Sequence, residues 1–440
     1  MAHRTNRRKF LKTTAVVGAG YFAASGLRAQ ESNSPNEQVN IASIGVGGKG
    51  DSDSRDAGTQ GNLVAICDID NNNLRKKGIA FPKARQYRDY RKMLDEYGKN
   101  IDAVTVSTPD HSHAPASLMA MRLGKHCFTQ KPMTHSIEEA HLMGEVAREM
   151  KLKTQMGNQG TSYDSLREMV AVIQKGTLGA VSEVHVWTNR PVWPQGDKVD
   201  LSNPAPIPSH VDWDLFLGPA EKRPYHQAIH PFKWRGFWSF GTGALGDMAC
   251  HTLNMPFMAL ELYDPTSVQA ETNGHDGQTY PGFSIIDFAF PAKGDRPAVK
   301  LVWYDGGKLP PKELFHGAKI QNRGALIIGD KGSLYAPGDY AEKGMTLHGV
   351  DKPDVEWVKS PGHFTEWIRS IKGGDAAVSN FADYAGPLTE TILLGNLALA
   401  GATEPGKGKK IAWDSKKLIA TNAPEVMHIV KKEYHNGFKI

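Results

Sequence analysis

The sequence predicts an α/β protein of two domains, a doubly wound parallel sheet followed by a second α/β domain built on an open sheet. Between residues 39 and 156, short apolar runs that suit buried parallel strands alternate with segments of helical periodicity. Beyond about residue 160, apolar and polar residues alternate along the predicted strands, which is typical of a sheet with one packed and one exposed face. The chain of 440 residues is long enough to form two substantial cores.

A glycine-rich loop follows the first predicted strand, Val39 to Ile44. It contains a G-x-G-x-x-G pattern at Gly45, Gly47 and Gly50, and the next apolar run ends on Asp68, 23 residues after Gly45. In this context the first glycine permits a tight turn, the second lets the backbone approach a pyrophosphate, and the third lets a helix pack against the sheet. The alternative is a glycine-rich turn that binds nothing, but the strand, helix and acid around the loop favour a binding role.

These features predict a Rossmann-type dinucleotide site. The diphosphate is expected at the N-terminus of the helix that the loop opens, because free N–H groups and the helix dipole favour an anion there. Asp68 is expected to accept hydrogen bonds from the adenosine ribose hydroxyls. Since its charge repels a 2′-phosphate, NAD(H) is favoured over NADP(H).

The rest of the first domain continues the alternation, and a capping box at Ser136 opens its strongest amphipathic helix. Ligands of such sheets bind at the carboxyl ends of the strands, where Asp68, Thr108, Gln130 and Gly157 are expected. The predicted helices are 71–80, 87–97, 114–123 and 136–150, and the further strands are 63–67, 101–107, 126–129 and 153–156.

The second domain contains a long segment rich in proline and tryptophan, between Pro191 and Pro231, that shows no clear periodicity. Loops of this length usually carry or cover a functional site. Alternating strands are predicted at 181–188, 284–290 and 298–304, and helices at 251–262, 364–371 and 388–398.

The first 29 residues resemble a twin-arginine export signal. Arg7 and Arg8 precede a short apolar stretch, and Leu27-Arg28-Ala29 offers a cleavage site. This stretch is too short and too rich in glycine and alanine to anchor the protein in a membrane. We therefore expect a periplasmic protein without membrane contact after signal removal. Its parts would be a linker at 30–38, an NAD-binding domain at 39–156 and a substrate-binding domain at 157–440.

The positive charge of the chain comes from this leader. The whole sequence carries a formal charge of +5, and removing the six basic residues of the leader leaves −1. A nucleic-acid partner therefore loses its electrostatic support. The three cysteines, Cys67, Cys127 and Cys250, are expected to be buried thiols rather than a disulfide framework.

Four motifs, in this order, resemble those of the Gfo/Idh/MocA oxidoreductases over essentially the whole length after the leader. They are the glycine loop, Thr108-Pro109-x-x-x-His113, Lys131-Pro132 and Asp247-x-x-x-His251. The resemblance implies a Rossmann domain followed by an α/β domain whose open, mostly antiparallel sheet faces the nicotinamide. It also implies a secondary alcohol of a sugar, sugar derivative or cyclitol as substrate, and a homo-oligomer.

On this resemblance Lys131 would hydrogen-bond the reacting hydroxyl, His251 would accept its proton, and Asp247 would bind or polarise the substrate. The chemistry agrees, because hydride transfer from an alcohol needs a base and histidine titrates near neutrality. Asp247 and His251 share one face if their segment is helical. The alternatives are an exposed lysine after a strand, and a helix-cap acid with a core histidine.

The resemblance also places Thr108, Pro109, His113, Gln130 and Lys131 beside the cofactor, although a turn role suits His113 equally. Gln130 is a departure, because the family usually has a glutamate there. Loss of a carboxylate beside Lys131 is expected to disfavour the ammonium and to lower the pKa of the lysine.

Substrate contacts are predicted at Asn158, Trp187, His230 and Arg235. Trp187 belongs to a group of five tryptophans within 52 residues, which is as compatible with core packing as with a wall for stacking sugars. A metal site built from His230 and the acid–imidazole pair lacks an obvious fourth ligand, so no metal is predicted.

The export signal and the nucleotide site together suggest that NAD(H) is taken up during cytoplasmic folding and held through many turnovers, because the periplasm holds little free cofactor. The hydride must then return within each cycle, either to a second sugar or to the same sugar after elimination of a glycosidic group. The sequence therefore leaves open an oxidoreductase and an NAD-dependent glycoside hydrolase or lyase. A non-catalytic sugar-binding protein is disfavoured by the intact Lys131, Asp247 and His251.

Overall fold

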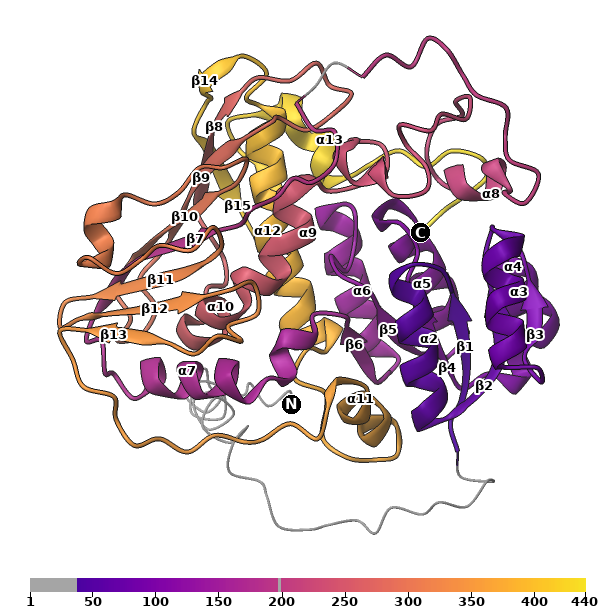
Figure 1. Ribbon diagram of the computed structural model, residues 1–440, viewed down its shortest axis with the longest axis horizontal. Helices are drawn as coiled ribbons and strands as arrows, with labels where there is room; N and C mark the ends of the chain where they lie inside the picture. The colour runs from indigo at the N-terminus through magenta and orange to yellow at the C-terminus, as the bar shows by residue number, and fades with distance from the viewer. Residues whose placement is uncertain (1–37, 197–198) are drawn as a thin grey trace, which may run out of the picture.

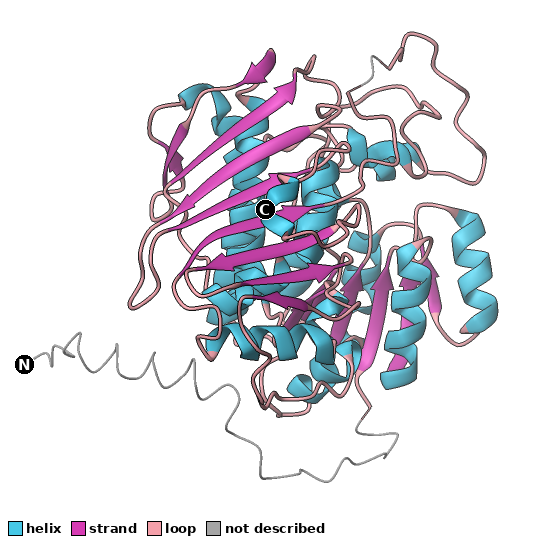
Figure 2. Ribbon diagram, turned by 60° about the vertical axis from the view of Figure 1, so that its left-hand side comes forward, coloured by secondary structure: helices cyan, strands magenta, loops and turns pink. Residues whose placement is uncertain are grey.

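The computed structural model describes residues 38–196 and 199–440 of the chain. The predicted export signal and all but the last residue of the predicted linker lie outside the described residues. The described chain contains two sheets, a smaller one in the N-terminal part and a larger one in the C-terminal part (Figures 1 and 2). No helix of the described ranges is long and apolar enough to cross a membrane.

The first sheet has six strands in the order β3-β2-β1-β4-β5-β6, and every neighbouring pair is parallel. This is the doubly wound order in which β1 and β4 bracket the point where the winding reverses, which confirms the predicted fold class. The strands are β1 (Asn40–Ile44), β2 (Asn62–Cys67), β3 (Arg85–Tyr87), β4 (Ala103–Val106), β5 (His126–Thr129) and β6 (Thr154–Met156). The helices are α2 (Lys49–Gln60), α3 (Asn71–Ala80), α4 (Tyr90–Tyr97), α5 (His113–Arg122) and α6 (Ile137–Glu149).

Capping residues fix the helix starts in this domain. The capping box at Ser136 is present, since its side chain accepts from Glu139 N–H and the Glu139 carboxylate accepts from Ser136 N–H. The prediction of a helix from residue 87 was wrong by three residues, because Tyr87 ends β3. The side chain of Asp89 instead accepts from Arg91 N–H and starts α4 at Tyr90.

The second sheet is mixed and mostly antiparallel, with one parallel pair, β7 and β10, among its paired strands. Burial alternates along β8 and β9, which is the periodicity that the sequence shows. Its strands are β7 (Val181–Trp187), β8 (Ser267–Asn273), β9 (Ser284–Phe290), β10 (Val299–Tyr304), β11 (Gly324–Gly329), β12 (Ser333–Pro337), β13 (Thr346–His348), β14 (Pro405–Lys407), β15 (Ile411–Asp414) and β16 (Ile419–Ala420).

Helices lie between the two sheets, against one face of the second sheet (Figure 1). A single helix from 251 to 262 was predicted, but the structure has two, and the first begins eight residues earlier, at Gly243. Asp247 and His251 therefore both belong to one helix, α9. The helices of this domain are α7 (Asp164–Gln174), α8 (Trp213–Leu217), α9 (Gly243–Thr252), α10 (Asn254–Leu260), α11 (His363–Ile371), α12 (Gly386–Ala400) and α13 (Met427–Val430).

One helix from the C-terminal part packs on the first domain. Phe364 of α11 stacks on Phe128 of β5 with ring centroids 4.5 Å apart, and Trp367 lies 5.7 Å from the same ring. The Trp367 indole N–H donates to the Lys153 carbonyl oxygen, next to β6. The core of the nucleotide-binding domain is thus completed by residues that lie more than 200 positions later. The three cysteines are buried and free, as predicted.

Candidate active site

The glycine loop has the geometry that its pattern predicts. Gly45 has a φ of +80°, and a Cβ there would lie 2.6 Å from the carbonyl oxygen of Ser107. A Cβ on Gly50 would collide with the Gly45 carbonyl oxygen, so α2 can approach the sheet only because this residue is glycine. The role of Gly47 is different in detail, since a side chain there would meet the amide of Asn73.

The N-terminus of α2 is open. Gly48 precedes the helix with a φ of +51°. Within residues 38–196 and 199–440, no atom lies within 4 Å in its side-chain direction and no side chain caps the helix. The first amides of a helix have no acceptor within it, and the helix dipole makes their end positive. This opening fits the diphosphate of a dinucleotide, and Gly48 to Gly50 would hold it.

Asp68, which was predicted to bind the adenosine ribose, accepts hydrogen bonds from the glycine loop itself. Its Oδ2 accepts from the backbone N–H groups of Val46 and Gly47, at 2.8 and 3.1 Å, and its Oδ1 accepts from Asp70 N–H at 2.9 Å. The carboxylate is nearly buried, and this burial raises its pKa against the opposing effect of these bonds. The Asn73 amide, which sequence reasoning missed, lies 3.3 Å from both carboxylate oxygens, at the edge where a ribose would bind.

Lys131 and Asp247 meet across the two domains. Lys131 follows β5, and its Nζ donates to Asp247 Oδ1 at 2.8 Å and to the Asp247 carbonyl oxygen at 2.6 Å. Burial would raise the pKa of Asp247, but the charges of Lys131 and Arg235 outweigh it and hold the pKa below its ordinary value. The carboxylate is therefore ionised at neutral pH, and the predicted juxtaposition is present.

His251 lies one turn after Asp247 on α9 and has no hydrogen-bond partner among the described residues. It is buried, its Nδ1 is enclosed without a partner, and its ring lies 4.6 Å from the ring of Tyr340. Burial and the positive charge of Lys131 hold its pKa well below 6.5. The imidazole is therefore neutral at pH 7, with a lone pair free to accept a proton.

The Thr108-Pro109 turn lies beside the glycine loop, and His113 joins it to the Lys131 loop. His113 Nδ1 lies 2.8 Å from the Pro132 carbonyl oxygen, and Nε2 lies 2.7 Å from the Thr108 carbonyl oxygen. Both ring nitrogens are therefore engaged by backbone. This geometry favours the alternative in which His113 fixes two turns, rather than a direct contact with a ligand.

Arg235, Gln130 and Asn158 were also predicted at the site, and the structure places each of them differently. Arg235 is at the site, because its Nε lies 3.6 Å from Asp247 Oδ1 and its guanidinium covers the Trp234 ring at 4.2 Å. Gln130 lies beneath the site, where its Nε2 donates to Asp53 Oδ2 at 2.8 Å. Asn158 is fully buried and accepts from Ser379 Oγ at 2.6 Å, so it is enclosed by protein.

Trp187 and His230 are not at the site. Trp187 is fully buried on the second sheet, stacks on Tyr335, and donates its indole N–H to the Gln321 carbonyl oxygen. His230 contacts Phe216, 5.2 Å away edge to face, in an aromatic cluster that also includes Trp234. Packing thus accounts for both, and the sugar-stacking wall of tryptophans does not form around them.

A tyrosine that sequence reasoning missed takes part in the site. Tyr340 borders His251 and also lies 6.3 Å from Tyr163, ring centroid to centroid. It follows β12, and neither β11 nor β12 was predicted, so nothing in the sequence placed it near α9. Its neighbour Asp339 is buried, with Oδ2 3.4 Å from Arg323.

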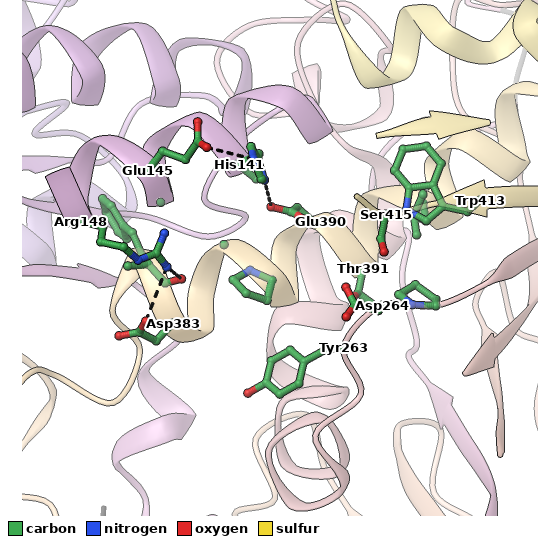
Figure 3. A pocket seen from close by; sticks show the side chains of 18 residues that line it. His141, Glu145, Arg148, Tyr263, Asp264, Asp383, Glu390, Thr391, Trp413 and Ser415 are labelled. Carbon is green, nitrogen blue, oxygen red and sulfur yellow. Dashed lines mark hydrogen bonds and ion pairs between the residues drawn. The ribbon is translucent and has the colours of Figure 1, made fainter. Parts of the chain in front are cut away.

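A separate cavity of about 360 Å³ lies between α6 and α12, away from these residues (Figure 3). His141 bridges two carboxylates there, 3.3 Å from Glu145 and 3.3 Å from Glu390. None of the residues that line this cavity takes part in the Lys131–Asp247 contact. The labelled lining residues are His141, Glu145, Arg148, Tyr263, Asp264, Asp383, Glu390, Thr391, Trp413 and Ser415.

Comparison with known families decides the assignment of the chain. Residues 12–158 match the model of the oxidoreductase family's NAD-binding Rossmann fold, and residues 164–337 match the model of its C-terminal α/β domain. The chain belongs to the Gfo/Idh/MocA oxidoreductase family. The members of this family are NAD-dependent oxidoreductases, and the architecture described above is theirs.

Solved structures with this fold include a dehydrogenase in complex with NADH and UDP-GlcNAcA, and an aldose-aldose oxidoreductase. The WlbA dehydrogenase from Bordetella pertussis, in complex with NADH and UDP-GlcNAcA, has a TM-score of 0.59 at 15% identity, with 86% of this chain and 99% of that chain covered. The aldose-aldose oxidoreductase from Caulobacter crescentus, complexed with glycerol, has a TM-score of 0.59 at 16% identity, with 86% and 100% covered. At these identities the similarity shows the fold alone.

The curated relatives that match this chain are named as glycosyl hydrolases rather than as oxidoreductases. A glycosyl hydrolase family 109 protein of Shewanella pealeana is 28% identical over 207 residues, which are 40% of this chain and 44% of the relative. A second, glycosyl hydrolase family 109 protein 1 of Shewanella sp. strain ANA-3, is 30% identical over 208 residues, with the same shares covered. The chain thus spans less than half the length of the curated relatives that it matches.

Proposed function

We propose that the protein is an NAD(H)-dependent oxidoreductase that acts on a secondary alcohol of a sugar, sugar derivative or cyclitol. The observation that carries the proposal is the contact between Lys131 and Asp247, 2.8 Å long. The imidazole of His251, which has no hydrogen-bond partner in the part of the chain that the structure describes, lies one turn away. A proton donor from one domain and two candidate acceptors from the other thus meet at one point. The strand ends that carry the glycine loop and Lys131 belong to the same edge of the parallel sheet.

Each side chain has a distinct part in this proposal. Bound NAD(H) would supply a hydride acceptor or donor for the alcohol carbon. The Lys131 ammonium would donate a hydrogen bond to the substrate oxygen, which stabilises the alkoxide that forms as the proton leaves. His251, neutral at pH 7, would accept that proton, and Asp247 would hold Lys131 and bind a neighbouring hydroxyl.

The cofactor proposal is NAD(H) rather than NADP(H), on the negative charge of Asp68 at the end of β2. We further propose that residues 1–29 direct export, and that the folded protein carries its cofactor into the periplasm. There it would act on a small carbohydrate or polyol, and the hydride would return to a substrate within each cycle.

A second candidate function is favoured by the curated relatives that are called glycosyl hydrolases. In this alternative a hydroxyl of a glycoside is oxidised to a ketone with reduction of NAD. The ketone acidifies the adjacent C–H, a base such as His251 removes that proton, and the glycosidic group leaves. Water then adds to the double bond, and the hydride returns to the ketone, so that the net reaction is hydrolysis.

Purification of the full-length chain, followed by mass spectrometry of whatever it carries, tests the proposal. Bound NAD or NADH is expected, near one molecule per chain. Incubation with glycosides then separates the two functions: free sugar without a net change in nicotinamide absorbance indicates hydrolysis, and a stoichiometric change indicates dehydrogenation. A protein that binds sugar but shows neither reaction would be the non-catalytic alternative, and one that uses only added NAD would refute cofactor retention.

A further inference from the structure

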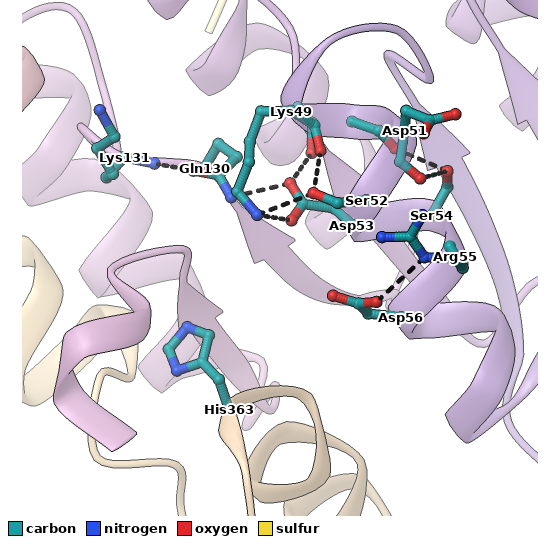
Figure 4. A network of polar contacts seen from close by, with 12 residues as sticks. Lys49, Asp51, Ser52, Asp53, Ser54, Arg55, Asp56, Gln130, Lys131 and His363 are labelled. Carbon is teal, nitrogen blue, oxygen red and sulfur yellow. Dashed lines mark hydrogen bonds and ion pairs between the residues drawn. The ribbon is translucent and has the colours of Figure 1, made fainter. Parts of the chain in front are cut away.

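Beneath the glycine loop, α2 carries a buried carboxylate that the dinucleotide pattern does not require. Asp53 is 0% exposed. Its Oδ1 lies 2.6 Å from Lys49 Nζ, and its Oδ2 accepts hydrogen bonds of 2.8 Å from both Ser107 Oγ and Gln130 Nε2 (Figure 4). One carboxylate thus connects the first turn of α2 with the carboxyl ends of β4 and β5.

The Gln130 side chain is held at both ends. Its Nε2 donates to Asp53, and its Oε1 accepts from the backbone N–H of Lys131 at 3.2 Å. Gly157 packs against the same amide, where a Cβ would lie 2.6 Å from Gln130 Cδ. The amide therefore has one orientation, between Asp53 and the residue whose ammonium reaches Asp247.

Asp53 also explains the residue type at position 130. Two carboxylates at hydrogen-bond distance cannot both be ionised, whereas an amide donates to a carboxylate without a change of charge. In the described part of the chain, the charged and titratable groups around the pair are Lys49 on α2, Lys131 on the following loop, His251 on α9 and His363 on α11. Among the described residues, only Lys49 forms an ion pair with Asp53, and it does so at Oδ1, whereas Gln130 donates to Oδ2.

We propose that Asp53 is a positioning residue for the lysine site: it orients Gln130, fixes the backbone of Lys131 through it, and requires glutamine where the family usually has glutamate. The proposal rests on the proposed function, in which Lys131 contacts the substrate. It adds a residue of α2 that touches neither substrate nor cofactor and acts through the Gln130 amide.

Four full-length proteins test this role: the wild type, Gln130→Glu, Asp53→Asn, and the double variant. In Gln130→Glu we expect NADH affinity at pH 8 to fall at least about tenfold, with partial recovery at pH 5.5, where the two carboxyl groups share a proton. The Lys131 amide should also exchange with deuterium faster. In the double variant an asparagine amide at position 53 donates to a glutamate carboxylate at position 130, so affinity and exchange should return to within about threefold of the wild type.

Gln155→Glu is the matched control. Gln155 is equally buried, on β6 of the same sheet, but its Nε2 donates to the His363 carbonyl oxygen at 2.7 Å rather than to a carboxylate. Adding Asp53→Asn to Gln155→Glu should restore neither NADH affinity nor amide exchange. The positioning role is wrong if the double variant binds NADH as weakly as Gln130→Glu does. It is also wrong if the double variant regains the thermal midpoint of the wild type but not its NADH affinity and Lys131 amide protection. If the wild type binds no nicotinamide nucleotide, the proposed function fails. The pH dependence of the midpoint and the amide exchange still test the pairing.

Discussion

Arg235 Nε lies 3.6 Å from Asp247 Oδ1, the oxygen that also accepts a hydrogen bond from Lys131 Nζ at 2.8 Å. Two cations, one from each domain, therefore share a single carboxylate oxygen. The side chain of Asp247 is only 14% exposed, so water cannot replace the carboxylate if it is removed. The charge balance at the junction of the domains depends on this one residue.

Asp247→Asn should abolish most of the activity without unfolding the protein. The amide keeps the size of the side chain but leaves Lys131 and Arg235 facing each other without a counter-charge. We expect turnover to fall by about 10²- to 10⁴-fold, the range typical of acid–base groups, because Lys131 loses the carboxylate that holds it at the substrate oxygen. Steady-state assays and circular dichroism measure the two effects. Asp295→Asn, on an exposed loop between β9 and β10, is the control and should retain full activity.

The pH–rate profile should lack an acid limb near pH 6.5. Because burial and the charge of Lys131 hold the pKa of His251 well below 6.5, the imidazole stays in its basic form as the pH falls through that value. Activity should therefore persist at pH 6 and decline only at lower pH. The measurement is kcat/KM from pH 5 to 9. An apparent pKa near 6.5 that disappears in His251→Gln would contradict the assignment of a buried, neutral base.

Thermodynamic stability should decrease as the pH falls below 6.5. Burial lowers the pKa of His111, His135 and His363 to about 3 in each case, so the unfolded chain binds protons at these sites that the folded chain does not. The stabilisation is complete above the unfolded pKa of 6.5 and is lost progressively toward pH 3. Each histidine contributes a slope of about 1.4 kcal/mol per pH unit in that range.

His363→Asn separates this effect from general acid denaturation. Urea unfolding between pH 4 and 6 should show a pH slope lower by the equivalent of one proton, since the amide can still donate to the Met156 carbonyl oxygen but does not titrate. Replacement of the exposed His428 serves as the comparison. An unchanged slope in His363→Asn would show that this imidazole is already protonated in the folded state.

Gly48→Ala should weaken dinucleotide binding more than it weakens the fold. Both Gly48 and Gly124 have a positive φ and open space in the side-chain direction, so alanine adds backbone strain at either position without a collision. The strain is larger at Gly48, because its ψ of −120° lies outside the left-handed helical region. Only the Cβ at Gly48 would project into the opening at the N-terminus of α2. We expect the larger loss of thermal stability in Gly48→Ala, and an increase of at least about tenfold in the Kd for NADH in Gly48→Ala alone. Equal affinities for NADH in the two variants would show that the diphosphate does not bind at this loop.

The sequence was most informative where chemistry and chain order coincide. The strand, the glycine loop and Asp68 form a local pattern, and a parallel sheet must bring their ends to one edge. Lys131 and Asp247, 116 residues apart, could be paired only through resemblance to a family, and the structure places them in contact. Nothing in either local sequence encodes that contact.

The predictions that failed concern side chains whose burial cannot be seen in the local sequence. Trp187 and a ligand-binding tryptophan share the same local sequence signals. The full burial of Trp187 and its stacking on Tyr335 show that it belongs to the core. The partner of Gln130 could not be predicted either, because Asp53 lies 77 residues away on a helix face that periodicity could not orient. Tyr340 depends on two strands whose alternation was not recognised.

The stacking of Phe364 and Trp367 on Phe128 has a practical consequence for protein engineering. A gene fragment that stops after β6 would expose this aromatic surface to water and would be prone to aggregation. A graft of the nucleotide-binding half onto another scaffold must therefore carry residues 363–371 with it. An exchange of this half between relatives should cut the chain at two places, so that residues 363–371 are exchanged together with it.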